Sequence, residues 1–279
     1  MLVGGPAGFR CPMSASGDKA QIAWQPLTAR GVAAFARAPF GRLLLVQLIV
    51  ALLAAGTVVW FLHQCWFPTI GSAIQALPPY GMLRSGTLEW SGSSPTCLAE
   101  GRFLAFVVDL DHAGRARSPA HVQVECGRQD FKVYSLFGFA QRAYPRGPTV
   151  PFNRTDLGPW WGAWAPVLLA MAGGMVAGGA MVGWGVLATL YCLPAWLIGF
   201  FANRDCTLGG TWRMAGAALM PGALFLCAVI LLYGLGALDL VRLAAGGAAH
   251  LLVGWAYLFF SVLGLPRHPA VPTRTNPFA

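Results

Sequence analysis

The longest uncharged stretch of the chain, from Trp160 to Ala202, constrains the fold more than any other feature. Its 43 residues include no Asp, Glu, Lys, Arg or His. As a helix that rises about 1.5 Å per residue it would be roughly 65 Å long, whereas about 20 apolar residues cross the hydrocarbon core of a bilayer. We therefore expect this stretch to cross a membrane twice and to reverse at Gly183-Trp184-Gly185.

The composition agrees with a membrane protein. Of the 279 residues, 56% are apolar and 10% are charged, whereas soluble domains carry about 25% charged residues. The net charge of +9 comes without a Lys-rich cluster or a nucleic-acid-binding signature, so we interpret it as positive charge that flanks membrane spans. The predicted partner is the lipid bilayer, and no nucleic acid is expected.

Hydropathy predicts an all-α transmembrane bundle of about five spans. They cover residues 43–62, 163–182, 184–201, 213–233 and 245–265. The first span begins after 42 residues and is 20 residues long, which favours an uncleaved signal anchor over a cleaved signal peptide. Five basic residues precede it and place the N-terminus of this multi-pass cell-membrane protein in the cytoplasm.

The two ends of the chain are expected to be largely disordered. Residues 1–42 form a cytoplasmic arm, and residues 266–279 form a Pro-rich tail. The alternative for the last part of the arm is a short interfacial helix from Leu27 to Phe40, with Phe35 and Phe40 on the lipid. The sequence leaves these two alternatives open.

The number of spans decides the side of the C-terminus. Five spans put it outside together with Arg204, Arg213, Arg267 and Arg274, against the positive-inside rule. Four spans return these arginines to the cytoplasm but leave residues 160–202 as one helix, or as a span plus a re-entrant piece. We expect five spans because stranding about 20 apolar residues off the membrane costs more than misplacing a few loop charges.

Residues 63–159 form the only polar domain, which the signal anchor places outside the cytoplasm. Period-two patterns predict four strands, at Thr87–Trp90, Arg102–Asp109, His121–Glu125 and Asp130–Leu136. A short helix is expected near Ile70–Ala76 and a Pro-rich connector at Tyr144–Pro159. Because Asp111-His112-Ala113-Gly114 is typical of a turn, we expect the second and third strands to form an antiparallel hairpin in a small β-rich domain.

Acidic residues of this domain are the candidates for acid–base or metal chemistry, namely Glu89, Glu100, Asp109 and Asp111. Asp109-Leu-Asp111-His112 is the best arrangement for a cation, yet it does not supply six oxygen ligands for calcium and lies where turns commonly place Asp. No GxSxG, HExxH, P-loop or dinucleotide fingerprint occurs. We therefore predict no enzyme, and no catalytic, cofactor-binding or metal site.

The centres of the expected spans carry no ionisable residue, although transporters usually place one there. His63 and His250 fall at span ends. Other polar or helix-breaking residues in the spans are Gln47, Thr57, Thr189, Pro166, Pro194 and Pro221. We predict a non-enzymatic membrane-organisation or partner-binding protein, whose partner is another membrane or extracytoplasmic protein. The alternative is a transporter or channel subunit that uses Gly- and Pro-broken helices.

Two thiols lie in the polar domain, at Cys97 and Cys126. An extracytoplasmic compartment permits disulfides, and a bridge here would close a loop of about 30 residues and stabilise by roughly 3–4 kcal/mol. The expected hairpin places Cys126 opposite a residue near 104 instead. The sequence leaves both the bridged and the free state open.

Two segments near the C-terminus carry a family resemblance. In Gly209–Leu224, GGTWRMAGAALMPGAL, a Gly-containing loop leads into a span with a central Pro, and in His250–Leu265, HLLVGWAYLFFSVLGL, an aromatic-rich helix ends in Gly-Leu. In these features the C-terminal four spans resemble Yip-type multi-span membrane proteins, including uncharacterised bacterial relatives. The resemblance implies a multi-span fold, a cytoplasmic N-terminus and a non-enzymatic role in membrane organisation. The family's cytoplasmic trafficking motifs are absent from the sequence, and no functional residue carries over.

Overall fold

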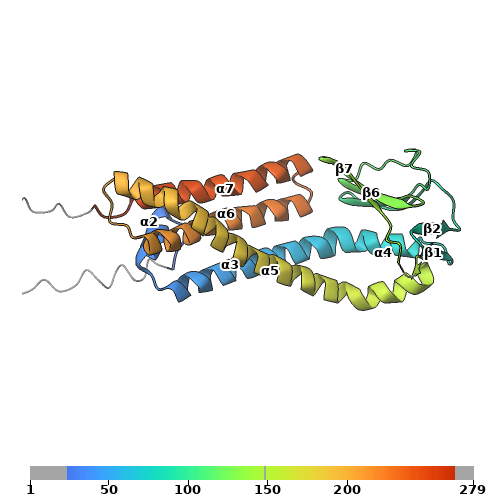
Figure 1. Cartoon of the computed structure of the whole chain (residues 1–279), viewed down its shortest axis with the longest axis horizontal. Coiled ribbons are helices and arrows are strands. Elements are labelled where there is room, and N and C mark those ends of the chain that lie inside the picture. Colours follow the sequence, from blue (N-terminus) through green and yellow to red (C-terminus); the bar gives the residue numbers. More distant parts are fainter. Residues whose placement is uncertain (1–23, 148, 268–279) are drawn as a thin grey trace, which may run out of the picture. The chain divides into compact units, whose positions relative to one another are not determined.

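A computed structural model describes residues 24–147 and 149–267, which are mainly helical (Figure 1). Within these residues, four helices are long and apolar enough to cross a membrane. They are Phe40–Gln75 (which comprises α3, η2 and α4), Arg154–Phe201 (α5), Leu208–Gly234 (α6) and Leu240–Leu263 (α7). Three expected spans, at residues 43–62, 213–233 and 245–265, fall within or nearly within α3, α6 and α7.

The expected break at Gly183-Trp184-Gly185 is wrong, because α5 is one uninterrupted helix of 48 residues (Figure 1). Each glycine costs a helix only about 1 kcal/mol, whereas a turn within an apolar run leaves several backbone groups unpaired at several kcal/mol each. The described chain therefore has four candidate membrane-crossing helices, and not five. At about 1.5 Å per residue α5 is roughly 72 Å long, more than twice the thickness of the hydrocarbon core.

The described chain divides into two compact units, and α5 contributes to both. The first consists of residues 24–47, 184–221 and 253–267, and its core includes the fully buried side chains of Phe35, Leu43, Met214 and Leu258. The second consists of residues 48–147, 149–183 and 222–252 and contains every strand.

The described part of the N-terminal arm is ordered within the first unit, whereas residues 1–23 lie outside the described residues, as do 268–279 of the expected tail. It forms α2 (Ala29–Ala34) and a 3-10 turn, η1 (Phe35–Arg37). Backbone carbonyls of α2 and η1 accept hydrogen bonds from Ser261 at 2.9 Å and Arg213 at 2.8 Å. The expected helix is therefore present in part. Phe35 is fully buried, so its expected placement on lipid is wrong, whereas Phe40 is 48% exposed.

The first long helix continues past the expected span end. After α3 (Phe40–Phe61), a π-helical turn, η2 (Leu62–Trp66), leads into α4 (Phe67–Gln75). Pro68 lies in the first turn of α4, where its missing N–H costs no hydrogen bond. The short helix expected near residues 70–76 is therefore the end of this longer rod.

Two sheets form the β-rich part of the second unit. One has the order β2-β1-β8 and the other the order β3-β4-β5-β6-β7. The strands are β1 (Gly81–Arg84), β2 (Thr87–Trp90), β3 (Thr96–Glu100), β4 (Leu104–Val108), β5 (Val122–Cys126), β6 (Asp130–Ser135), β7 (Gly138–Ala143) and β8 (Val150–Pro151). The four expected strands correspond to β2, β4, β5 and β6. The expected connector ends early, because β8 interrupts it and α5 begins at Arg154.

The expected antiparallel hairpin is also wrong, because β4 and β5 pair in parallel, with Leu104 opposite Val122 and Val108 opposite Cys126. Residues 109–121 therefore cross over from one end of the sheet to the other. A parallel connection needs a dozen or more residues, and this segment is just long enough. Leu104 and Val107 point to opposite faces of the interior strand β4, and both are buried, as expected for a strand that is covered on both faces.

An aromatic cluster joins the β-rich part to the helices of the second unit. The ring of Phe103 lies 5.5 Å from Phe61 at the end of α3 and 4.9 Å from Tyr233 in α6. His121 stacks on Tyr233 at 5.4 Å, and its Nδ1 lies 2.7 Å from the Tyr233 hydroxyl. The β-rich part is thus packed directly against two of the long helices.

Candidate functional site

Strand β5, with the sequence VQVEC, separates the two faces of the five-stranded sheet. Gln123 and Glu125 point to one face and are 4% and 1% exposed. Val124 and Cys126 point to the other face and line an apolar cavity. Because successive side chains of a strand alternate between faces, one short segment builds both a buried polar site and the wall of a cavity.

The crossover of residues 109–121 covers the polar face. Gln123 donates to the carbonyl of Ala116 at 3.0 Å and accepts from the amide of Ser118 at 2.9 Å. Buried Asp109 accepts from the amide of Gly114 at 2.9 Å. Buried side-chain groups cost free energy unless they are hydrogen-bonded, and the crossover supplies these partners.

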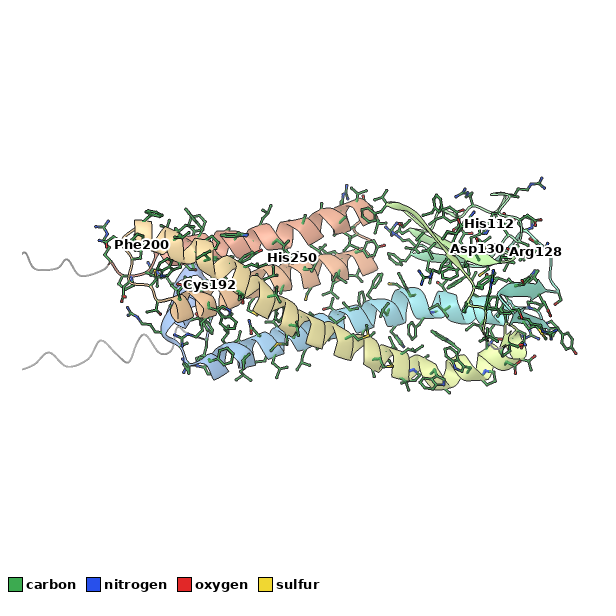
Figure 2. All side chains as sticks on the ribbon, in the orientation of Figure 1. His112, Arg128, Asp130, Cys192, Phe200 and His250 are labelled. Carbon is green, nitrogen blue, oxygen red and sulfur yellow. The ribbon has the colours of Figure 1, made fainter. Side chains whose placement is uncertain are left out.

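His112 lies between two carboxylates on this face; Figure 2 labels His112 and Asp130 in the β-rich part. Its Nδ1 is 2.5 Å from Oε1 of Glu125 on β5, and its Nε2 is 2.6 Å from Oδ1 of Asp130 on β6. Gln141 on β7 donates a further hydrogen bond to Asp130. His112 has a left-handed backbone with φ of 53°, and a side chain at Gly127 would collide with its ring. The crossover is therefore fastened to both strands by one imidazole.

The electrostatics of this cluster favour the charged imidazolium. Burial lowers the pKa of His112, but the hydrogen bonds with Glu125 and Asp130 raise it by more, so it lies above the ordinary 6.5. Burial raises the pKa of Asp130, but hydrogen bonds from His112 and Gln141 hold it below its ordinary 3.8. Since both ring nitrogens are engaged by carboxylates, neither is free to accept a proton from a substrate. The cluster can cross-link the sheet, but it is not arranged as a general base.

The acids that the sequence singled out do not converge. Asp109 is occupied by its turn, whereas Asp111 is exposed and pairs with Arg128 at 3.6 Å. Glu100 accepts from Ser118 at 3.0 Å, and Glu89 lies 3.7 Å from Arg84. In the ranges 24–147 and 149–267, no three His, Cys, Asp or Glu side chains are grouped as a metal site would require.

Sequence reasoning missed Glu125 and Asp130, the true partners of His112. They lie 13 and 18 residues further along the chain, so no local motif contains all three residues. The available signal was the alternation of apolar and polar residues in β5. This alternation places Gln123 and Glu125 together on one face of a strand inside the sheet. Such polar residues require partners when the face is covered.

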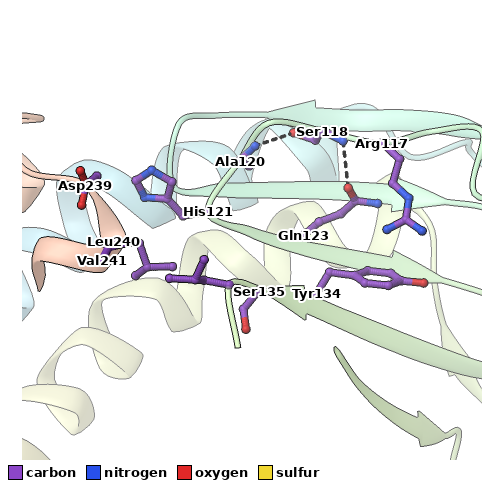
Figure 3. A pocket seen from close by; sticks show the side chains of 11 residues that line it. Arg117, Ser118, Ala120, His121, Gln123, Tyr134, Ser135, Asp239, Leu240 and Val241 are labelled. Carbon is purple, nitrogen blue, oxygen red and sulfur yellow. Dashed lines mark hydrogen bonds between the residues drawn. The ribbon is translucent and has the colours of Figure 1, made fainter. Parts of the chain in front are cut away.

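A second, amphipathic pocket of about 370 Å³ lies where β5 and β6 approach the start of α7 (Figure 3). Arg117 stacks over the ring of Tyr134 at 4.6 Å. Burial and nearby Arg102 lower the pKa of His121, so that its imidazole is neutral at neutral pH. The serines of this pocket are used elsewhere: Ser118 donates to Glu100, and Ser135 accepts from the amide of Phe137.

The apolar cavity lies on the opposite face of the sheet and has a volume of about 310 Å³. Its walls come from α4, both sheets and the first turn of α5, and include Ile74, Leu88, Phe106, Val124, Phe131 and Leu157. Among the residues that the structure describes, none with a charged side chain lines it. Tyr144 directs its hydroxyl to the carbonyl of Gly127 at 3.2 Å, and Cys126 contributes a thiol whose pKa is raised to about 11, chiefly by burial.

This cavity is partly open to the surface, and its exposed lining is almost wholly apolar. An exposed apolar patch in a concave site is typical of a ligand-binding pocket. Water is a poor occupant because it would find almost no hydrogen-bond partners there. The cavity is thus suited to an apolar ligand.

Cys97 and Cys126 are both free thiols. Cys97 on β3 pairs with Val107 of β4, and Cys126 on β5 pairs with Val108 of the same strand. Strands lie about 4.8 Å apart, so two cysteines on either side of β4 are roughly 10 Å apart. A disulfide needs Cα atoms within about 7 Å, and the fold therefore disfavours the bridge.

Polar residues of the long helices bond to nearby backbone carbonyls. Gln47 is buried and donates to Gly216 at 3.5 Å, and Thr57 donates to Leu53 at 2.9 Å. Thr189 donates to Gly185 at 2.9 Å, and the ring of His250 bonds to Gly247. No helix ends at Pro166, Pro194 or Pro221, which lie inside α5 and α6. These contacts are typical of helix packing.

Comparison with known proteins adds no family to this description, since no family model, no curated protein and no solved structure matches the chain.

Proposed function

We propose that this chain is a four-span, non-enzymatic integral membrane protein that organises the outer surface of the membrane through its β-rich part. Both the arm and the end of α7 lie on the cytoplasmic side in this proposal. The β-rich part follows the first span and lies on the opposite side. This retains the cytoplasmic N-terminus and the non-enzymatic role expected from the sequence and from the Yip-type resemblance.

The distribution of arginines supports the orientation. The first unit contains Arg30, Arg37, Arg42, Arg204, Arg213 and Arg267. One of these arginines has an acidic partner: Arg37 pairs with Asp205 at 2.9 Å. With four spans, all of these arginines lie on one side, as the positive-inside rule favours. The charge conflict of the five-span arrangement thereby disappears.

The observation that carries the proposal is the position of an apolar tip between β6 and β7. Leu136, Phe137 and Phe139 are 55%, 78% and 64% exposed. Leu136 shares a pocket with Leu240 and Val241, the first residues of α7. The tip is therefore at the level where α7 begins, which is the outer boundary of the membrane in this proposal. Exposed aromatic and aliphatic side chains at that level are suited to the lipid interface.

A binding role is favoured over catalysis by the chemistry of the polar groups. His112 has both nitrogens engaged by carboxylates, and the serines near His121 bond to other groups. A transport role has weaker support, because Gln47 and Thr57 are satisfied by backbone carbonyls.

Reporter fusions at residues 110, 205 and 237 test the topology. We expect 110 and 237 to report the outer side and 205 to report the cytoplasm. Fusion sites 110 and 205 on the same side would refute the four-span arrangement and favour five spans.

An environment-sensitive dye at residue 137 tests the tip in vesicles. Nitroxides on lipid headgroups should quench it strongly, whereas a dye at exposed Ser93 should be quenched weakly. Equal weak quenching at both sites would refute membrane contact by the tip.

A further inference from the structure

The chemistry of the apolar cavity restricts its ligand to an uncharged hydrocarbon. Leu88, Phe106 and Phe131 come from both sheets and face the same space. The polar atoms nearby are a phenol that bonds to a backbone carbonyl and a thiol that burial keeps protonated. A ligand that entered with a charged group would lose its hydration without gaining a partner.

Size narrows the choice to a single chain. A dry apolar cavity of about 150 Å³ binds one benzene molecule, which has six carbon atoms. The cavity here has about 310 Å³, roughly twice that size, and so has room for about a dozen carbon atoms. This is most of one acyl chain, and it is too small for two.

The walls of the cavity include residues of the long helices that we propose to cross the bilayer, and the bilayer is a source of acyl chains. Ile70 and Ile74 belong to α4, which continues α3 without a break, and Leu157 belongs to α5. Beyond Leu157, the ring of Trp161 packs against Phe67 of α4 at 4.8 Å. Residues 154–183 of α5 include no buried side chain, and their exposed apolar side chains include Trp160 and Trp164. An exposed apolar surface therefore begins within one helical turn of the cavity residue Leu157.

We infer that the cavity binds one acyl chain of a membrane lipid, which enters along the surface of α5 while its headgroup stays outside. This inference rests on the proposed placement of the β-rich part at the outer membrane surface. It adds a ligand class and a binding site to that proposal.

Photo-crosslinking of the full chain in vesicles tests the inference. The vesicles contain phosphatidylethanolamine and phosphatidylglycerol, with a small fraction of phosphatidylethanolamine that carries a diazirine at the tenth carbon of one chain. After irradiation, peptide mapping should find adducts on cavity residues such as Phe106 and Phe131, besides the adducts on the long helices. Adducts on the long helices with none on the strand residues of the cavity in the unmodified protein would overturn the inference, and this readout does not depend on any variant.

A matched pair of substitutions adds a second readout. Ala73 lies on α4, is 5% exposed and lines the cavity, so Ala73→Phe should fill the space and reduce cavity adducts at least fivefold. Ala140→Phe makes the same change on exposed β7 and should leave them unchanged. Equal adduct yields in the two variants would contradict cavity binding. If the dye at residue 137 is quenched while the cavity remains unlabelled, only this inference fails; if neither signal is seen, the placement on the membrane fails as well.

Discussion

The two faces of β5 differ in how their buried space is filled. On the face of Gln123 and Glu125, both side chains meet hydrogen-bond partners from the crossover. On the face of Val124 and Cys126, side chains from α4 and both sheets leave about 310 Å³ unfilled. The same strand therefore has one face closed by specific pairing and one face that remains open to a ligand.

The difference shows where specificity and adaptability lie in this domain. Buried polar pairs tolerate little displacement, because a lost partner leaves an unsatisfied group. Apolar contacts are non-directional and depend mainly on the area removed from water. We expect the polar face to hold the strands in place and the apolar face to accept chains of variable structure. Four predictions test this contrast.

The largest effect is expected from removing the charge of Glu125. The substitution Glu125→Gln leaves a buried imidazolium without its nearest carboxylate, and breaking a buried pair typically costs about 3–5 kcal/mol. Thermal unfolding of the full chain at pH 6 should show a clear drop in midpoint. As a control, Glu89→Gln removes an exposed ion pair with Arg84 and should cost less than about 0.5 kcal/mol. Similar losses in both variants would show that the cluster does not hold the polar face together.

A smaller effect is expected on the cavity face from Leu88→Ala. Leu88 is 4% exposed, and truncating a buried leucine costs about 2–5 kcal/mol. We expect a value near the lower end, and a smaller loss in lipid vesicles than in short-chain detergent, because an acyl chain can occupy the added space. Tyr80, which is 79% exposed and lies outside both the cavity and the tip, offers the control Tyr80→Ala, with an effect within about 0.5 kcal/mol. A loss that is independent of lipid would argue for an unliganded core.

The pH dependence of stability should come from the polar face. The pKa of folded His112 is raised above 6.5, so its stabilisation is complete below about pH 6.5 and is lost as the pH rises through the folded pKa. The pKa of folded Asp130 is lowered below 3.8, so its contribution is present above that value and is lost as the pH falls further. Unfolding midpoints measured from pH 4 to pH 9 should be highest between these limits. In the variant Glu125→Gln, the unfolding midpoint should fall less steeply as the pH rises above 6.5. If the fall is as steep as in the unmodified protein, groups other than His112 cause it.

The smallest effect is expected from reductant. Because Cys97 and Cys126 lie on opposite sides of β4, reduction should leave the unfolding midpoint unchanged, whereas loss of a native bridge typically costs about 2–5 kcal/mol. Alkylation followed by mass measurement should find both thiols free. Cys97 should react faster, since it is exposed whereas burial raises the pKa of Cys126 to about 11. Equal protection of both thiols until reductant is added would establish the bridge.

Several local elements followed directly from the sequence. The strand expected at Thr87–Trp90 is β2 with the same bounds, and the uncharged residues 43–62 lie within α3 except for the last. Periodicity and hydropathy suffice here because they depend on neighbouring residues only. The cluster of His112 was beyond such reasoning, since its partners Glu125 and Asp130 come from two other strands.

The sequence by itself determined that the chain has long apolar helices and a polar insertion of short strands, because a shortage of charge and a two-residue alternation are visible in any local window. Only the tertiary structure decided that residues 154–201 form one helix and that β4 runs parallel to β5. Alternation is the same for parallel and antiparallel pairs, and the glycines at 183 and 185 permit either a helix or a turn. Which arrangement is adopted depends on backbone hydrogen bonds and on partners that are distant in the chain.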